Sequence, residues 1–136
     1  MFAKFLDIEN DGAYEFIHEP QLPQIARAIA ALDGNTKTVV CIEGEMKAHM
    51  DIGGGAAQGC VVALSYDNSK FYIVINPAAA GEHIDVKVGG DPRPYPAEML
   101  VSKDIALKAA KTFAETGAAE PSIHWRDTSD VKPKES

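Results

Sequence analysis

The sequence contains few of the residues that carry out chemistry in enzymes. Its two cysteines, Cys41 and Cys60, lie in separate apolar segments without a CxxC pattern, so we expect two reduced, buried thiols. Its four histidines have no HxxxH or HxH spacing of the kind that zinc sites use, and there is no GxSxG motif. These absences argue against nucleophilic catalysis and metal binding. We expect no catalytic residue, no metal, no cofactor and no enzyme activity.

The sequence also lacks a long apolar run. No stretch approaches the ~20 consecutive apolar residues that span a membrane, and the first residues, MFAKFLDIEND, do not resemble a signal peptide. A chain of 136 residues suits one domain with its own core. We therefore expect a cytoplasmic protein that does not insert into membranes.

Basic residues are outnumbered. The chain has 13 Lys and Arg against 20 Asp and Glu, which gives a formal net charge of −7. Such a surface repels nucleic acid and attracts basic partners. More than half of the excess falls in residues 1–20, where only Lys4 opposes five carboxylates: Asp7, Glu9, Asp11, Glu15 and Glu19. This segment is either a solvated acidic stretch or a surface that faces the basic groove of a partner.

Aromatic residues make up only 7% of the chain. Phe113 and Trp125 fall on apolar faces and are expected in the core. Tyr66, Phe71 and Tyr72 surround one turn, where they either fill the core or form an exposed anchor for a partner.

Two segments have the pattern of helices. In residues 20–34, Pro23 suits a first turn, apolar residues recur at helical spacing, and Gly34 suits a left-handed stop. The second helix is expected from Ser102, a good N-cap, to about Thr116, with Gly117 as its end. The buried line of this helix is expected to consist of Ile105, Ala109 and Phe113.

The middle of the chain has the pattern of strands. Strands are expected at 36–43, 45–52, 59–66, 70–76, 82–88 and 122–126. Residues 45–52 alternate, with Met46, Ala48, Met50 and Ile52 on the inner face. The three prolines of residues 91–96 exclude a helix or a central strand there, so an extended connection is expected.

Short connections between these strands favour antiparallel pairing. The fold class expected is α+β, with a single twisted, mainly antiparallel sheet of about five to seven strands and two helices packed on one face. Residues 1–127 are expected to form one domain and residues 128–136 a polar tail. The glycine-rich run 53–59 has no phosphate-binding lysine and is expected to be a mobile loop between two strands.

The C-terminal part of the chain resembles a known family. The order Ala106, Ala109, Phe113, Thr116-Gly117, Pro121, Ile123 and Trp125, within residues 99–126, is similar to the C-terminal signature of the Imm1 family of bacterial immunity proteins. The resemblance implies a non-enzymatic inhibitor that binds a cognate toxin. It further implies a toxin that attacks nucleic acid, commonly a deaminase or nuclease, and a tight one-to-one complex that occludes the toxin's substrate-binding face.

Charge and expected exposure select two groups of candidate toxin-binding residues. The first is the acidic N-terminal segment with Asp7, Glu9 and Asp11, and the second is the central hairpin with Tyr66, Asp67, Asn68 and Tyr72. Two other functions stay open. One is an assembly subunit that pairs through its apolar strands, and the other is a small-ligand-binding domain that uses the loop at Gly53–Gly59.

Overall fold

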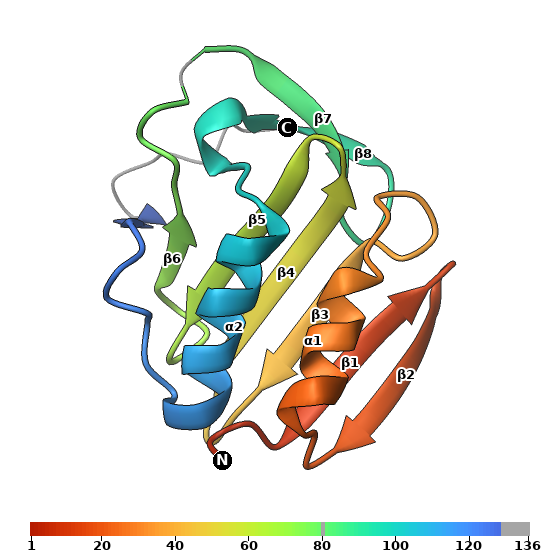
Figure 1. Ribbon diagram of the computed structural model, residues 1–136, viewed down its shortest axis with the longest axis vertical. Coiled ribbons are helices and arrows are strands. Elements are labelled where there is room, and N and C mark those ends of the chain that lie inside the picture. Colours follow the sequence, from red (N-terminus) through yellow and green to blue (C-terminus); the bar gives the residue numbers. More distant parts are fainter. Residues whose placement is uncertain (80, 129–136) are drawn as a thin grey trace.

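A computed structural model describes residues 1–79 and 81–128, and it has the expected α+β architecture, with two helices in front of one twisted sheet (Figure 1). The helices are α1 (Leu22–Ala30) and α2 (Lys103–Thr116), with a short 3-10 helix, η1, at Ala97–Met99. The strands are β1 (Phe5–Asn10), β2 (Ala13–His18), β3 (Val39–Glu43), β4 (His49–Ala56), β5 (Gly59–Ser65), β6 (Phe71–Val74), β7 (His83–Lys87), β8 (Pro92–Pro96) and β9 (Trp125–Asp127).

Seven of these strands form the main sheet, in the order β2-β1-β3-β4-β5-β6-β9, and every neighbouring pair is antiparallel. The prediction of a mainly antiparallel sheet with two helices on one face is therefore confirmed. The remaining strands, β7 and β8, form a small separate sheet. The proline-rich segment 91–96 forms β8, which has one partner only, as expected for a strand whose prolines cannot donate hydrogen bonds.

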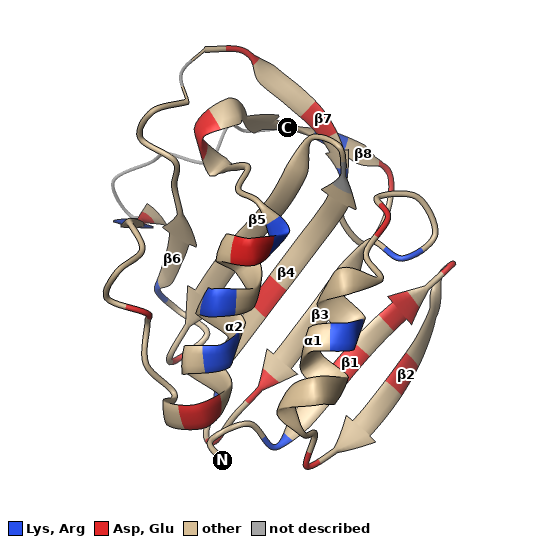
Figure 2. Ribbon diagram, in the orientation of Figure 1, with Lys and Arg blue, Asp and Glu red and all other residues tan. Residues whose placement is uncertain are grey.

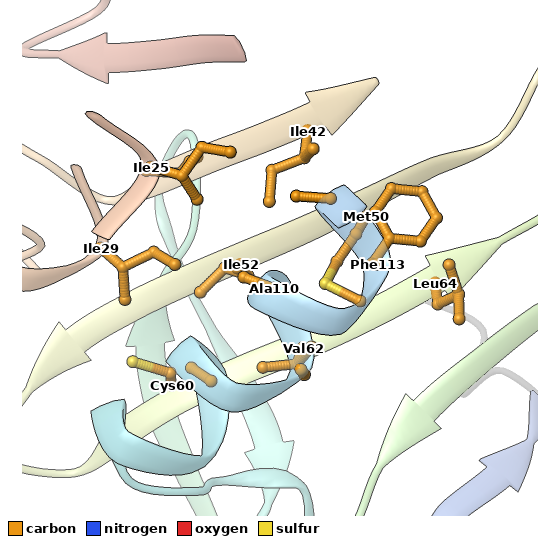
Figure 3. Close-up of a cluster of buried hydrophobic side chains, with 14 of the residues drawn as sticks. Ile25, Ile29, Ile42, Met50, Ile52, Cys60, Val62, Leu64, Ala110 and Phe113 are labelled. Carbon is orange, nitrogen blue, oxygen red and sulfur yellow. The ribbon is translucent and has the colours of Figure 1, made fainter. Parts of the chain in front are cut away.

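The core lies between the helices and the sheet (Figure 3). Phe113 on α2 is fully buried above Met50 of β4 and Leu64 of β5, and Ile25 and Ile29 of α1 cover the neighbouring strands. Ser102 caps α2 by accepting a hydrogen bond from the backbone N–H of Ile105, and Gly117 ends the helix in the left-handed conformation, both as predicted.

The buried line of α2 differs from the prediction in one position. Ile105 is 37% exposed, and the helix instead buries a strip of alanines with Phe113: Ala106, Ala109, Ala110 and Ala114. Small side chains let α2 approach α1 and the sheet closely, so the buried face of this helix is set by size as much as by hydrophobicity. The spacing of Ile105, Ala109 and Phe113 alone could not reveal this.

The acidic segment 1–20 contains a hairpin formed by β1 and β2. Asp11 and Gly12 make the turn between β1 and β2, and both have positive φ angles, of 52° and 84°. An Asp-Gly pair between two alternating segments is a strong hairpin signal. Leu6 and Ile8 alternate with the acidic residues Asp7 and Glu9, which is the pattern of a strand. A count of charges alone does not reveal this pattern.

The glycine-rich segment is also ordered differently from the expectation. Gly53, Gly54 and Gly55 belong to β4, Gly59 begins β5, and only two residues lie between the strands. A β-carbon on Gly53 would collide with Val88, and one on Gly55 would lie 2.5 Å from Cβ of Leu32. These glycines thus allow other elements to pack directly on the strand backbone, and the prediction of a mobile loop was wrong.

The strand predicted at 45–52 begins later than expected. β4 starts at His49, and Met46, which was placed on the inner face, is 96% exposed in the connection from β3. The other three inner residues, Ala48, Met50 and Ile52, are buried as predicted.

Among the described residues, no helix is long and apolar enough to cross a membrane. The predicted tail from residue 129 onward lies outside the described residues, and the hydroxyl of Thr128 donates to the carbonyl of Phe71 (2.9 Å).

Candidate functional site

The side of the main sheet that faces away from the helices presents two rows of side chains. One row crosses the strands through His18, Phe5, Glu43, His49, Ser65 and Phe71, and the next through Phe16, Asp7, Cys41, Asp51, Ala63, Ile73 and Arg126. Between them runs a row that points toward the helices and includes the fully buried Leu6, Ile42, Met50 and Leu64. Because side chains alternate along a strand, the two rows share the opposite face.

The β7–β8 sheet covers part of this opposite face. Val86 of β7 and Leu100 pack on Val61 of β5, and the lack of a side chain at Gly53 makes room for Val88. Arg126, at one end of its row, is held by Glu98 of η1 through a 2.6 Å ion pair. Every other member of the two rows except Ser65 is at least partly exposed. We call the two rows from β2 to β6 the open face.

The open face carries carboxylates without cationic partners. Strands β1 to β4 contain five Asp and Glu residues and no Lys or Arg, whereas basic residues lie on both helices (Figure 2). Within the described part of the chain, Asp7, Glu43 and Asp51 form no ion pair with a lysine or arginine, and the only such contact is from His49 to Asp51 at 3.9 Å. Of the five carboxylates, Asp7, Glu43 and Asp51 lie in the two rows of the open face, whereas Glu9 is buried and Glu15 points to the helix side.

Asp7 differs from Glu43 and Asp51 in having a buried oxygen atom, Oδ1, without a hydrogen-bond partner among the described residues. Burial, the adjacent Glu43 carboxyl group and the charge of Asp51 raise the pKa of Asp7 to about 6. Burial and the nearby Asp51 also raise the pKa of the Cys41 thiol, which is consequently protonated at neutral pH and a poor nucleophile.

A hollow opens beside these groups. It has a volume of about 420 Å³ and is lined by β3, β4, the connection between them and Asn68 of the β5–β6 turn, including Cys41, Glu43, His49 and Asp51. The lining includes two acidic residues, Glu43 and Asp51, and one lysine, Lys47. Asp7, Cys41 and Glu43 also offer three potential metal-ligand atoms within 4.8 Å of one another. A metal ion would have to displace the protons that the raised pKa values of Asp7 and Cys41 favour.

Large aromatic side chains lie exposed at the β2 end of this side of the sheet, with Phe16 and Phe5 in the open face and Tyr14 in the next row, opposite Glu9. Phe16 is 65% exposed, Tyr14 54% and Phe5 38%. Phe16 stands opposite Asp7 and Phe5 opposite Glu43 in the strand register, so each of these phenylalanines neighbours a carboxylate. Exposed aromatic side chains of this kind are candidate anchors for a partner.

The first predicted group of site residues is divided by the structure. Asp7 lies on the open face, and Asp11 is exposed at the turn of the β1–β2 hairpin. Glu9 is only 5% exposed, and its carboxylate accepts hydrogen bonds from the backbone N–H (3.0 Å) and hydroxyl (2.6 Å) of Thr38 and from the backbone N–H of Gly12 (3.1 Å). The role of Glu9 visible in the structure is to hold the hairpin against β3.

The second predicted group lies at the opposite end of the sheet from Asp11 (Figure 1). Asp67 accepts backbone hydrogen bonds from Ser69 and Lys70, and Asn68 has a positive φ of 61°, so both shape the β5–β6 turn. Tyr66 is 43% exposed and its hydroxyl accepts from the backbone N–H of Ala119 (3.1 Å). Tyr72 is partly buried edge-on to Tyr66, with ring centroids 6.1 Å apart.

The three aromatics near this turn do not form one patch. Tyr72 follows the row of Leu64 on the helix side of the sheet, whereas Phe71 lies on the open face against the ring of His49. Only Asn68 of the second group lines the hollow, where it joins residues near Asp7. The structure thus brings Asp7 and Asn68 to the same side of the sheet and leaves Asp11 and Tyr72 elsewhere.

Five candidate residues were missed by the sequence prediction: Phe5, Tyr14, Phe16, Glu43 and Asp51. The alternation of Tyr14, Phe16 and His18 after the Asp-Gly turn was a usable signal for a strand with an aromatic face. No comparable signal existed for Glu43 and Asp51, because their proximity to Asp7 depends on the strand order.

Comparison with known proteins agrees with the C-terminal resemblance and extends it. No curated protein and no solved structure matches the chain. The family described as immunity protein Imm1 matches residues 15–127, from the second strand of the N-terminal hairpin to the last strand of the sheet. The match covers both helices, the main sheet except β1, and the small β7–β8 sheet, so the chain belongs to the Imm1 family of immunity proteins.

Proposed function

We propose that this immunity protein neutralises a toxin that attacks nucleic acid, such as a deaminase or a nuclease, by forming a one-to-one complex that occludes the toxin's substrate-binding face. Family membership supports the binding of a cognate toxin. The observation that carries the finer proposal is the charge of the open face, where strands β1 to β4 place the carboxylates of Asp7, Glu43 and Asp51 and no lysine or arginine. An enzyme that binds nucleic acid needs a basic groove, and an acidic surface complements such a groove.

In this mechanism the acidic side chains occupy the positions of substrate phosphates. Opposite charges accelerate the encounter, and close packing then slows dissociation. The protein acts by binding alone, within the cytoplasm of the cell that makes the toxin, and it performs no reaction and needs no cofactor. Residues 1–127 form the domain that carries the activity.

The candidate contact residues predicted from the sequence differ in their suitability. Asp11, Tyr66, Asp67 and Asn68 are exposed and available to a partner, and Asp7 lies partly exposed among the acidic residues of the sheet. Tyr72 packs edge-on against Tyr66, and the buried carboxylate of Glu9 accepts hydrogen bonds from Thr38, so these two residues hold the surface in place.

The test is co-purification with the product of the adjacent toxin-like gene, followed by titration calorimetry and an assay of toxin activity on DNA and RNA. We expect a one-to-one complex with a dissociation constant of about 1 nM or lower, and loss of toxin activity at equal concentrations. Binding to a toxin that acts on neither nucleic acid would contradict the proposed toxin class. Absence of binding would contradict the proposed complex itself.

A further inference from the structure

We propose that the toxin docks on the open face, with Phe5, Tyr14 and Phe16 as anchors at the β2 end and with arginine side chains of the toxin placed between these rings and the carboxylates of Asp7, Glu43 and Asp51. This inference rests on the proposed function and specifies the surface and the chemistry of the partner.

The exposure of the aromatic side chains is the first support. Phe16, at 65%, and Tyr14, at 54%, lie on the same strand and point to the same side of the sheet, because they are two residues apart. Phe5 lies on the same side of the sheet on β1, opposite His18, and the centroids of these two rings are 4.9 Å apart. Rings of this size exposed together cost solvation free energy in the isolated protein, and a partner that covers them recovers it.

The pairing of rings with carboxylates is the second support. Phe16 of β2 faces Asp7 of β1, and Phe5 of β1 faces Glu43 of β3, so each ring has a carboxylate as its neighbour on the adjacent strand. A guanidinium group can stack on an aromatic ring while it donates two hydrogen bonds to a carboxylate, which an ammonium group does less well. Arginine is therefore the side chain that fits this repeated pair, and its charge would also favour the ionised form of the unpartnered Asp7.

The hollow beside Glu43 and Asp51 is the third support. With about 420 Å³ it can admit an extended side chain, and its lining includes both carboxylates together with the amide of Asn68. The exposed Lys47 lies at this hollow, and the neighbouring Lys4 is directed to Glu45 at 3.9 Å. Among the described residues, neither Glu43 nor Asp51 forms an ion pair with a lysine or arginine, so an arginine from outside would be their first such partner.

Charge also argues against a second copy of this chain as the occupant. In a two-fold symmetric dimer through the open face, Asp7, Glu43 and Asp51 would meet the same acidic group of the other copy. Like charges at the centre of an interface oppose association, whereas a basic toxin surface relieves the repulsion among these three carboxylates.

The decisive experiment measures the affinity of full-length variants for the toxin domain encoded by the adjacent gene, at about 50 mM and about 300 mM NaCl. Phe16→Thr removes the most exposed ring while keeping a residue suited to a strand. The double variant Glu43→Gln and Asp51→Asn removes two charges at nearly constant size. The matched controls are Leu107→Ala, an exposed apolar residue, and Asp104→Asn, an exposed acid, both on α2.

We expect Phe16→Thr to weaken binding at least about ten-fold at both salt concentrations, since anchors dominate binding energy. The double variant should weaken binding about ten-fold at low salt and show a smaller dependence on salt than the wild type. Both controls should stay within about two-fold of the wild type. Circular dichroism of each variant confirms that it is folded.

Other outcomes separate this inference from the proposed function. If the wild type binds and inhibits the toxin, but the open-face variants bind equally well, the docking surface is elsewhere and only this inference fails. If the wild type does not bind the toxin domain, the proposed function fails. A concentration-dependent dimer that Phe16→Thr abolishes would show that the face joins two copies of this chain, and would overturn the inference.

Discussion

The carboxylate of Glu9 and the hydroxyl of Thr38, 29 residues apart in the sequence, form a buried hydrogen bond of 2.6 Å. Glu9 also accepts from the backbone N–H of Gly12 at the β1–β2 turn, and the Thr38 hydroxyl accepts from the backbone N–H of Gly89 beyond β7. This short network joins the N-terminal hairpin, the start of β3 and the small sheet. A residue that sequence analysis selected for its charge therefore has a structural role.

Replacement of Glu9 by alanine should destabilise the protein by about 2–3 kcal/mol, because the substitution leaves the donors of Thr38 and Gly12 unpaired. Thr38→Val should cost about 1–2 kcal/mol by removing the hydroxyl alone. Urea unfolding at pH 7 measures both values. The exposed Glu15→Ala on β2 is the control, with an expected change within about 0.5 kcal/mol. Equal stability of Glu9→Ala and Glu15→Ala would contradict the structural role.

The contribution of Glu9 to the stability of the protein should decrease as the pH falls. Burial tends to raise the pKa of Glu9, but the hydrogen bonds from Thr38 and Gly12 outweigh it and lower the pKa below the ordinary value of 4.5. The stabilisation from Glu9 is then present above that value and is lost as the pH falls through the lower pKa of the folded state. The stability difference between the wild type and Glu9→Ala should shrink when unfolding is measured under increasingly acidic conditions.

Asp7 is expected to behave in the opposite way. Its pKa rises from 3.8 to about 6 in the folded protein, so the folded state holds a proton more tightly than the unfolded state. The resulting stabilisation is complete below 3.8 and is lost as the pH rises toward about 6. Asp7→Asn should thus be more stable than the wild type at pH 7.5 by about 1 kcal/mol, a value reduced for partial solvent screening.

Thermal unfolding of wild type and Asp7→Asn at pH 4.5 and pH 7.5 tests this prediction. The advantage of the variant should be present at the higher pH and shrink at the lower one, since an amide resembles the protonated acid. Glu43, Asp51 and the Cys41 thiol face Asp7 in both proteins, and the variant removes the repulsion of Asp7 with the Glu43 and Asp51 carboxylates. A variant less stable than the wild type at pH 7.5 would show that the Asp7 charge is favourable.

Gly55 provides a test of the packing at the end of β4. It has a φ of 100°, and a β-carbon there would lie 2.5 Å from Cβ of Leu32. Gly55→Ala should destabilise the protein by about 2–4 kcal/mol, through backbone strain and displacement of Leu32. Gly90→Ala is the matched control, because nothing lies within 4 Å of its β-carbon position, and its free energy of unfolding should change little. If Gly55→Ala left the free energy of unfolding unchanged, the result would contradict close packing of Leu32 on β4 and favour a mobile loop at residues 53–59.

The confirmed predictions concern features that depend on residues close to one another in the sequence. Ser102 and Gly117 delimit α2 because capping and the left-handed conformation depend on single residues. The turn at Asp67 to Ser69 follows in the same way, since the side chain of Asp67 bonds to the backbone two and three residues ahead. Alternating apolar residues then placed most of the strands.

The predictions that failed concern contacts between distant segments. Gly53 and Gly55 looked like a loop because their partners, Val88 and Leu32, lie on other elements. Glu9 looked like a surface acid because Thr38 follows 29 residues later. The assembly of Asp7, Glu43 and Asp51 into one acidic face required the order β1-β3-β4, which no periodicity specifies. Candidate contact residues could therefore be chosen by type but not located on a common surface.

The central claim, that this immunity protein neutralises its toxin through the open face, is tested most directly by titration calorimetry. The wild type and Phe16→Thr are each titrated into the toxin domain of the adjacent gene, with toxin activity measured in the same samples. The account predicts a tight one-to-one complex and full inhibition for the wild type, and at least about ten-fold weaker binding with matching loss of inhibition for Phe16→Thr. Equal affinity and equal inhibition by the two proteins would contradict it.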